Sequence, residues 1–297
     1  MRCQRSNLNQ AYIPKGSNIL HNSFGTAPGI KIETSEKMVI LLPGPPRELE
    51  PMWNNHVLPA LETDTKEFHK DFYILGLPES KMADILGNIL NTENPISVAP
   101  YAGLGQIRLR VSAVANDEKD FDEKTGDAII QVKKLLNGHV FDHPAPETLL
   151  KILREKGLSI ATAESCTGGL IAKTLTDISG ASNVFMGGAV TYSNQAKIDV
   201  LGVSSESLEK FGAVSKEVAK EMAQAAKRVF KTDVAISTTG IAGPTGGTAE
   251  KPVGLVYMGI ATPNGVSVIK EVFTGTRDDV RIKTLMRVLW ESIRKLS

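Results

Sequence analysis

The feature that most constrains the fold is a strand, a sharp turn and a helix in immediate succession. Leu158 to Ala163 is a short apolar run with a β-branched residue, which is typical of a buried strand. The turn that follows, Thr162 to Gly169, is rich in Ser, Thr and Gly, and from Leu170 onward apolar residues recur at helical spacing. We therefore expect an α/β domain with Ser165 at the end of a strand.

Such a turn has a chemical use. The first N–H groups of a helix have no intrahelical partner, so the turn around Ser165 is predicted to hold an anion or an oxyanion beside the hydroxyl. That is where a nucleophile is useful. The alternative is a Gly-rich strand-to-helix turn of the sort that any α/β protein contains.

Length and charge narrow the class of protein. The 297 residues predict two or three domains, and the net charge of +1 gives no field that attracts nucleic acid or an acidic membrane. No apolar run approaches the ~20 residues of a membrane span, and no signal peptide is recognisable. We therefore expect a cytoplasmic protein that does not bind membranes, and we do not expect it to bind nucleic acid. Cys3 and Cys166 offer neither a disulfide framework nor a zinc cluster.

Three segments are predicted. Residues 1–64 contain one strand, about Lys37 to Leu42, flanked by Pro- and Gly-rich rigid loops that include 42–48. Residues 65–143 read as a small α+β unit, with strands at 72–75 and 106–114 and helices at about 80–90 and 121–136. A Pro-rich linker at 142–146 leads into the third segment, residues 144–297.

The third segment has the densest pattern. Its predicted strands are 158–163, 184–192 and 234–236, followed by a hairpin at 253–273. Its predicted helices run from Pro146 to before Gly157, from a cap at Asn194, from a cap at Ser215, and over 277–294. The helix capped by Ser215 is expected to face inward with Val218, Met222, Ala225, Ala226 and Val229.

The third segment contains no histidine, so a Ser-His-Asp arrangement cannot form from its own residues. Lysine is the usual substitute, and Lys197 is the best placed because residues 192–197 also lead from a strand end into a helix. Strand ends of one polarity line one edge of a parallel sheet, so Ser165, Tyr192 and Lys197 are predicted to meet there.

Each of these residues has an ordinary alternative. A lysine acts as a base near neutral pH only if its pKa falls well below about 10.4, and most lysines are solvated. Tyr192 fits a core aromatic with its hydroxyl at the rim. Cys166 is the rival nucleophile, since a thiolate at a helix N-terminus has a lowered pKa.

Two further features point to ligands. The loop 240–247 is Gly-rich but lacks the Gly-Lys-Ser/Thr ending of a nucleotide-binding P-loop. Arg277 and Arg281 lie one helical turn apart at a helix start, either as a solvated face or as a clamp on a carboxylate or phosphate. No metal-ligand spacing is recognisable in this segment, so we expect no obligatory metal.

Four motifs in this segment together resemble the C-terminal domain of the CinA (competence/damage-inducible protein) family. They are Ala163 to Gly169, Gly188 to Asn194 with Lys197, Gly240 to Pro244, and Lys251 to Gly254. The resemblance, which covers about residues 146–297, implies an α/β/α sandwich with nicotinamide mononucleotide (NMN) deamidase activity. The family's catalytic serine, tyrosine and lysine fall on Ser165, Tyr192 and Lys197.

The interpretation that follows is a cofactor-free amidohydrolase acting on NMN through a Ser-Lys acyl-enzyme mechanism, with an oxyanion hole in the turn 166–169. The predicted substrate-binding residues are Cys166, Thr167, Gly168, Gly169, Gly243, Arg277 and Arg281.

The earlier segments resemble CinA too. Motifs in residues 1–64 match the end of its molybdopterin-binding-like domain, and 65–143 its KH-like middle domain. The family's opening strand and metal-binding acidic residues have no counterpart, so we expect a truncated first domain. In the family, the first domain is associated with ADP-ribose pyrophosphatase activity. We expect that activity, and its need for a divalent metal, only if the site of the first domain is complete.

The second alternative is a non-catalytic nucleotide- or molybdopterin-binding CinA-like protein. Residues 65–143 contain Gly103-Leu104-Gly105 but not the Gly-x-x-Gly loop with which KH domains clamp nucleotides. A half-domain exposes its core, which favours a homodimer.

Overall fold

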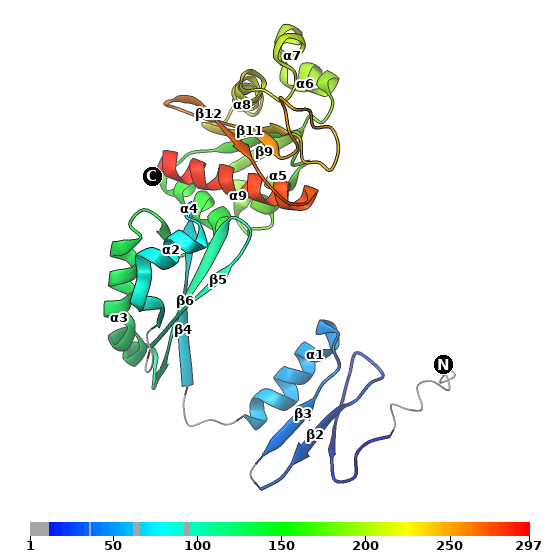
Figure 1. The fold of residues 1–297 in the computed structure, drawn as a ribbon, viewed down its shortest axis with the longest axis vertical. Coiled ribbons are helices and arrows are strands. Elements are labelled where there is room, and N and C mark those ends of the chain that lie inside the picture. Colours follow the sequence, from blue (N-terminus) through cyan, green and yellow to red (C-terminus); the bar gives the residue numbers. More distant parts are fainter. Residues whose placement is uncertain (1–11, 36, 62–65, 92–95) are drawn as a thin grey trace. The chain divides into compact units, whose positions relative to one another are not determined.

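The computed structural model describes residues 12–35, 37–61, 66–91 and 96–297, coloured in Figure 1. The chain forms two compact units, Met1–Lys66 and Glu67–Ser297. The predicted domain boundaries at 64/65 and 143/144, and the predicted homodimer, stay predictions.

In the first unit, strands β1 (Asn18–Leu20), β2 (Gly29–Glu33) and β3 (Met38–Leu41) form an antiparallel sheet, and α1 (Pro46–Met52) continues into turns at Trp53–Val57 and Leu58–Ala60. The predicted strand is β3, whereas β1 and β2 were not predicted. The prediction of a rigid loop over 42–48 is wrong at its end, because α1 begins at Pro46. Proline is tolerated in a first helical turn, where its missing N–H would have no partner.

The middle part of the chain is a four-stranded sheet with two helices. Its elements are β4 (Lys66–Leu75), α2 (Glu79–Leu86) with a 3₁₀ turn (Gly87–Asn91), β5 (Ile96–Ala102), β6 (Gln106–Ala115), α3 (Glu118–Leu135) and β7 (Val140–Phe141), in strand order β5-β6-β4-β7. Strand β5, which contains Pro100, was not predicted. It is an edge strand, the position in a sheet where proline is tolerated.

The C-terminal part is a three-layer α/β/α sandwich. Its elements are α4 (Ala145–Lys156), β8 (Ile160–Glu164), α5 (Leu170–Thr176), a 3₁₀ turn (Ala181–Asn183), β9 (Phe185–Val190), α6 (Asn194–Leu201), α7 (Ser205–Phe211), α8 (Lys216–Phe230), β10 (Val234–Gly240), β11 (Leu255–Thr262), β12 (Gly265–Val272) and α9 (Arg277–Leu296).

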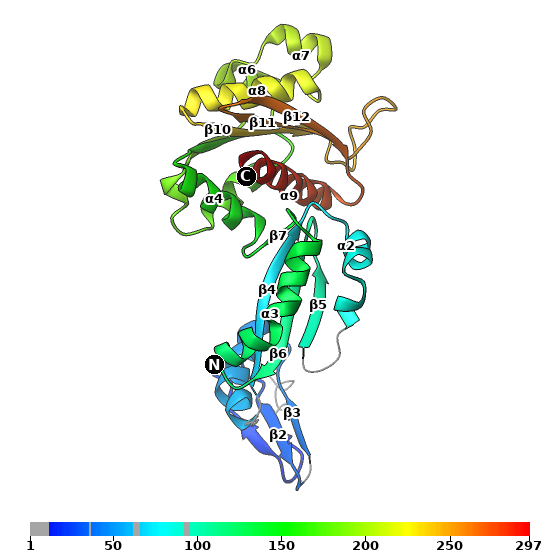
Figure 2. The same ribbon diagram turned by 90° about the vertical axis from the view of Figure 1, so that its left-hand side faces the viewer.

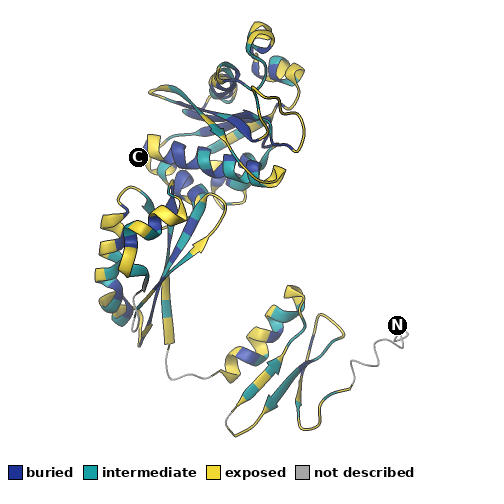
Figure 3. Cartoon of the chain, in the orientation of Figure 1, coloured by how far each residue is buried: buried dark blue, intermediate teal, exposed yellow. Residues whose placement is uncertain are grey.

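The sheet of this sandwich has the order β12-β11-β10-β8-β9. Helix α8 covers one face, while α4 and α9 lie on the other, as Figure 2 shows, and α5 packs in the same core cluster as α4 and α9. Every residue of β8 is buried, and Figure 3 shows the central strands dark along most of their length. A strand that is covered on both faces cannot alternate polar and apolar residues. The predicted mixed α/β fold with a C-terminal sandwich is therefore confirmed.

The directions of three strands place the candidate residues. Strand β8 is parallel to both β9 and β10, with Glu164 paired to Val190 on one side and to Thr238 on the other. The carboxyl ends of these three strands therefore lie at one edge of the sheet, as the sequence predicted.

Two local predictions in this domain are wrong. Ser193, not Asn194, caps α6, since its side chain accepts the N–H of Ala196. A serine hydroxyl suits this position as well as an asparagine amide, so sequence alone did not separate the two. In α8, capped by Ser215 as predicted, Val229 is 45% exposed because it lies in the last turn, beyond the sheet-facing residues.

Candidate active site

Ser165 lies directly after β8, at the start of the turn that leads into α5. Its N–H donates to the carbonyl of Thr238 (2.9 Å), which extends the β8–β10 ladder by one residue. The turn closes through Gly168 and Gly169, with φ values of 62° and 92° that favour glycine. The Ser165 side chain is almost buried and borders a pocket.

Glu164, which sequence reasoning did not select, fills the N-terminus of α5. Its buried carboxylate accepts the N–H groups of Gly169 (2.9 Å), Ile171 (3.1 Å) and Ala172 (2.8 Å). These three N–H groups are therefore not available to a ligand anion, because the chain supplies its own carboxylate. The signal in the sequence was an acidic residue at the end of the strand that leads into this helix.

The predicted oxyanion hole therefore has fewer N–H donors than the turn 166–169 contains. Gly168 donates its N–H to the carbonyl of Ser165 (3.1 Å), and Gly169 donates to Glu164. Within the described part of the chain, the N–H groups of Cys166 and Thr167 donate to no other residue. Only these two N–H groups of the turn remain for an oxyanion.

Lys197 reaches Ser165 from the neighbouring strand end. It lies in the first turn of α6, its side chain is 1% exposed, and its Nζ is 3.1 Å from Oγ of Ser165. The Nζ also donates to the carbonyls of Thr191 (2.9 Å) and Tyr192 (3.3 Å). Burial lowers the pKa of Lys197, an effect partly opposed by the nearby Cys166.

The contacts of Lys197 suit an uncharged amine. Carbonyl oxygens only accept, so each of the two carbonyls takes one N–H. A neutral amine has two N–H bonds and one lone pair, and with both N–H bonds used the lone pair is left for Ser165. The arrangement is that of a base directed at a hydroxyl.

Tyr192 takes part through its backbone rather than its ring. Its side chain is 61% exposed, and its hydroxyl accepts from Nη2 of Arg277 (2.9 Å). The carbonyl of Tyr192, by contrast, accepts from Lys197. The structure brings Ser165 and Lys197 together, while the Tyr192 ring lies at the mouth of the pocket.

The two predicted arginines have different surroundings. Arg277 borders the pocket and also donates from Nη1 to the carbonyl of Gly243 (2.9 Å). Arg281 does not border it; its guanidinium donates from Nε (3.2 Å) and Nη2 (2.9 Å) to the carbonyl of Thr167. Arg281 therefore stabilises the turn through the carbonyl of Thr167 and does not line the pocket.

Cys166 lies in a setting that opposes thiolate formation. Burial raises the pKa of its thiol to about 11. A thiol is a poor nucleophile when protonated, so Ser165 is favoured over Cys166 as the attacking group.

The pocket at this edge has a volume of about 220 Å³. Of the predicted residues, Ser165, Cys166, Tyr192, Lys197 and Arg277 line it. Thr167, Gly168, Gly169, Gly243 and Arg281 do not. Asn194, Ala213, Val214, Thr239, Gly240 and Ala242, which were not selected as site residues, complete its walls.

Two features are absent from the described residues. These residues contain no group of three or more His, Cys, Asp or Glu residues that could hold a metal ion. They also contain no helix with the length and apolar character needed to cross a membrane.

The chain matches two family descriptions, "CinA C-terminal domain" over residues 142–296 and "Damage-inducible protein CinA KH domain" over 69–141. It is 45% identical to a competence-damage inducible protein of Thermoanaerobacter pseudethanolicus over 96% of this chain and 70% of that one. A Clostridium perfringens (strain 13) relative of the same description is 46% identical over the same shares.

The chain also resembles solved structures of competence- or damage-inducible proteins. The competence/damage inducible protein CihA from Agrobacterium tumefaciens is 43% identical, with a TM-score of 0.50 over 52% of this chain and 97% of that one. A competence or damage-inducible protein from Enterobacter asburiae is 33% identical, with the same TM-score over 52% and 96%. The chain belongs to the CinA family.

Proposed function

We propose that this protein is an amidohydrolase that converts NMN to nicotinate mononucleotide and ammonia. The observation that carries the proposal is the buried Lys197 Nζ, 3.1 Å from Oγ of Ser165 and with two carbonyls as its other partners. Family membership supports a CinA-like function, and the four motifs that resemble the deamidase domain suggest the nicotinamide nucleotide as substrate.

In the first step, neutral Lys197 takes the Ser165 proton while Oγ attacks the carboxamide carbon. The carbonyl oxygen becomes an oxyanion, which the N–H groups of Cys166 and Thr167 stabilise. Preorganised donors of this kind are each worth about 10²- to 10³-fold in turnover.

In the second step, protonated Lys197 gives its proton to the amide nitrogen as the C–N bond breaks, and ammonia leaves. The acyl group stays on Ser165. A water molecule then loses a proton to Lys197 and attacks the acyl carbon, which releases nicotinate mononucleotide and restores the Ser165 hydroxyl.

The pocket suits one end of this substrate. Its volume of about 220 Å³ lies below the ~300 Å³ at which sites for whole drug-sized ligands begin, so we assign it to the nicotinamide ring. Arg277 is exposed at the mouth of the pocket. Two of its N–H groups donate to the Gly243 carbonyl and the Tyr192 hydroxyl, and its guanidinium has further N–H groups for a ligand. We assign it to the phosphate of the nucleotide.

The test is ammonia release from NMN, without added metal, by the parent chain and by Ser165→Ala and Lys197→Ala variants. We expect the parent to release ammonia and each variant to lose at least about 10³-fold in turnover. Lys173→Ala serves as the control, because Lys173 is an exposed lysine of α5 whose charge pairs with Asp177. A Ser165→Ala variant with near-parent activity would end the serine mechanism, and an inactive parent would end the NMN assignment.

A further inference from the structure

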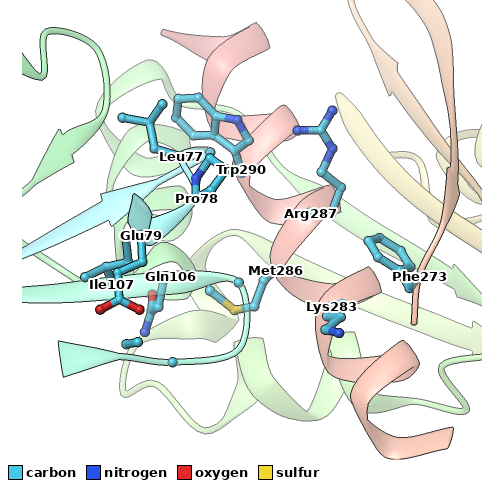
Figure 4. Close-up of a pocket in the computed structure, with 14 residues that line it drawn as sticks. Leu77, Pro78, Glu79, Gln106, Ile107, Phe273, Lys283, Met286, Arg287 and Trp290 are labelled. Carbon is cyan, nitrogen blue, oxygen red and sulfur yellow. The ribbon is translucent and has the colours of Figure 1, made fainter. Parts of the chain in front are cut away.

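A second pocket, of about 340 Å³, lies where the middle domain meets α9 (Figure 4). Its middle-domain wall comes from the start of α2 with the loop before it and from the β5–β6 hairpin, and its other wall comes from α9 and from Phe273, which follows β12. The side chains labelled in Figure 4 are Leu77, Pro78, Glu79, Gln106, Ile107, Phe273, Lys283, Met286, Arg287 and Trp290.

This pocket is separate from the Ser165 site. The two share no lining residue. Helix α9 contributes to both, with Arg277 at the Ser165 pocket and residues 283–290 at the second pocket. Clefts between domains are a preferred location for small-molecule sites.

The walls offer contacts for a flat apolar group. Phe273, Met286 and Trp290 provide two aromatic rings and a thioether, the partners that aromatic ligands favour. The volume is near the lower limit for small-molecule sites, which suits a ligand with a single ring.

The indole of Trp290 is packed at one end of this wall. Trp290 is only 7% exposed and lines the pocket. A Cβ on Gly76 would lie 2.2 Å from Nε1, so glycine at this position lets the backbone pack directly against that edge of the indole. The part of the ring that lines the pocket adds aromatic surface for a ligand.

The charges of the lining favour a ligand with a single negative charge. Arg287 is already paired with Glu271 (3.2 Å) and Glu291 (3.1 Å). Lys283 forms no salt bridge among the described residues, and its Nζ donates to the carbonyl of Thr274. The pKa of Asp279, one turn earlier on α9, is lowered by hydrogen bonds from Thr276 and also by the charge of Lys283. Glu79 lies across the pocket from Lys283 in Figure 4 and would repel a second negative charge.

We propose that this pocket binds a small aromatic monoanion, a single ring that carries one carboxylate. The ring lies against Met286 and Phe273. The carboxylate faces α9, where it accepts from Lys283.

The probes are benzoate, benzamide, benzylamine and phenyl phosphate, which share one ring and differ in charge. The chain has two tryptophans, so a full-length Trp53→Phe variant makes Trp290 the only indole reporter. Binding is followed by Trp290 fluorescence and by ligand-observed NMR. We expect benzoate to bind about fivefold more tightly than benzamide or benzylamine, and phenyl phosphate to bind no better than benzoate.

Two variants of α9 locate the probe. Lys283→Gln should weaken benzoate binding about fivefold, whereas Arg277→Gln, about 1.7 helical turns away at the Ser165 pocket, should leave it unchanged. The proposal is overturned if benzamide binds as well as benzoate, if Arg277→Gln is the variant that weakens binding, or if neither method detects benzoate at tens of millimolar. None of these outcomes depends on activity toward NMN.

Discussion

At the residue scale, the charge of one buried lysine decides the chemistry. The side chain of Lys197 is removed from water, and its Nζ contacts two carbonyls and a hydroxyl instead of a carboxylate. Desolvation disfavours the ammonium form, so the pKa of Lys197 lies below its ordinary value. Below that pKa the amine is protonated and has no lone pair for Ser165.

This predicts the pH dependence of the amidase reaction. The rate constant kcat/KM for NMN should fall about tenfold per pH unit as the pH drops below the pKa of Lys197, and reach a plateau above it. Because that pKa is lowered, the plateau should begin at a lower pH than for an ordinary lysine, whose pKa is about 10.4. A pH–rate profile with initial rates of ammonia release measures it, and activity that stays constant into the acid range would contradict a lysine base.

The rival nucleophile makes a second prediction. The pKa of the Cys166 thiol, about 11, leaves it protonated at neutral pH, so its sulfur is not needed for attack. Cys166→Ala should keep ammonia release within about threefold of the parent, because the N–H of residue 166 remains after the substitution. Ammonia release and iodoacetamide sensitivity, measured side by side, check this. A loss as large as that expected for Ser165→Ala would make Cys166 the nucleophile.

The sequence predicted the pairing of Ser165 with Lys197 because both follow strand ends, and parallel strands share an edge. It did not predict which atoms of Tyr192 take part, since backbone carbonyls leave no mark on residue type. It also placed Arg281 on the ligand, whereas the guanidinium binds the carbonyl of Thr167. Contacts from side chain to backbone depend on the path of the chain, which spacing does not give.

At the scale of single elements, α5 depends on the carboxylate of Glu164. Three N–H groups donate to this one fully buried side chain: that of Gly169, which precedes the helix, and those of Ile171 and Ala172 in its first turn. The same contacts fix the turn that holds Ser165. Helix α5 has only seven residues, so its propensity alone would not maintain it.

Substitution of Glu164 should therefore be costly. In Glu164→Gln, the amide NH₂ replaces one accepting oxygen and faces N–H groups, so at least one buried donor loses its partner. The free energy of unfolding should fall by about 2–3 kcal/mol. Urea denaturation measures it, with Glu155→Gln on the exposed side of α4 as the control, which should change it by less than about 0.5 kcal/mol. Equal midpoints for the two variants would show that the carboxylate does not support α5.

Two of the elements that the sequence missed share a cause. Strand β5 and helix α1 both contain proline at positions that propensity treats as breaks, Pro100 and Pro46. Both are tolerated because the missing N–H lies at a sheet edge or in a first helical turn. Only the tertiary arrangement shows which N–H groups need partners.

At the scale of the whole second unit, α9 joins the C-terminal sandwich to the middle domain. Its Trp290 ring lies 5.3 Å from the His139 ring and 5.9 Å from the Phe141 ring, measured between centroids. Leu75, from β4, belongs to the same buried cluster as the residues of α4 and α9. Residues 67–297 form one compact unit, so we expect them to unfold in a single transition.

The contact between Gly76 and Trp290 tests this connection. Gly76 has φ +74°, and a Cβ there would meet Nε1 of Trp290 at 2.2 Å. Gly138 has nearly the same φ, +78°, but a Cβ there would meet nothing within 4 Å. Gly138→Ala therefore reports the cost of the left-handed backbone alone, about 1 kcal/mol, whereas Gly76→Ala adds the displacement of a packed indole, about 2 kcal/mol more.

Urea unfolding of both variants, followed by far-UV circular dichroism and by Trp290 fluorescence in the Trp53→Phe background, measures the difference. If the domains unfold together, Gly76→Ala shifts both signals equally, because loss of the contact lowers the stability of the entire unit. If the fluorescence change comes first and circular dichroism follows in a separate step, the two domains are only loosely joined. In that case α9 belongs to the sandwich alone, and the contact with Gly76 adds nothing to the stability of the Ser165 site.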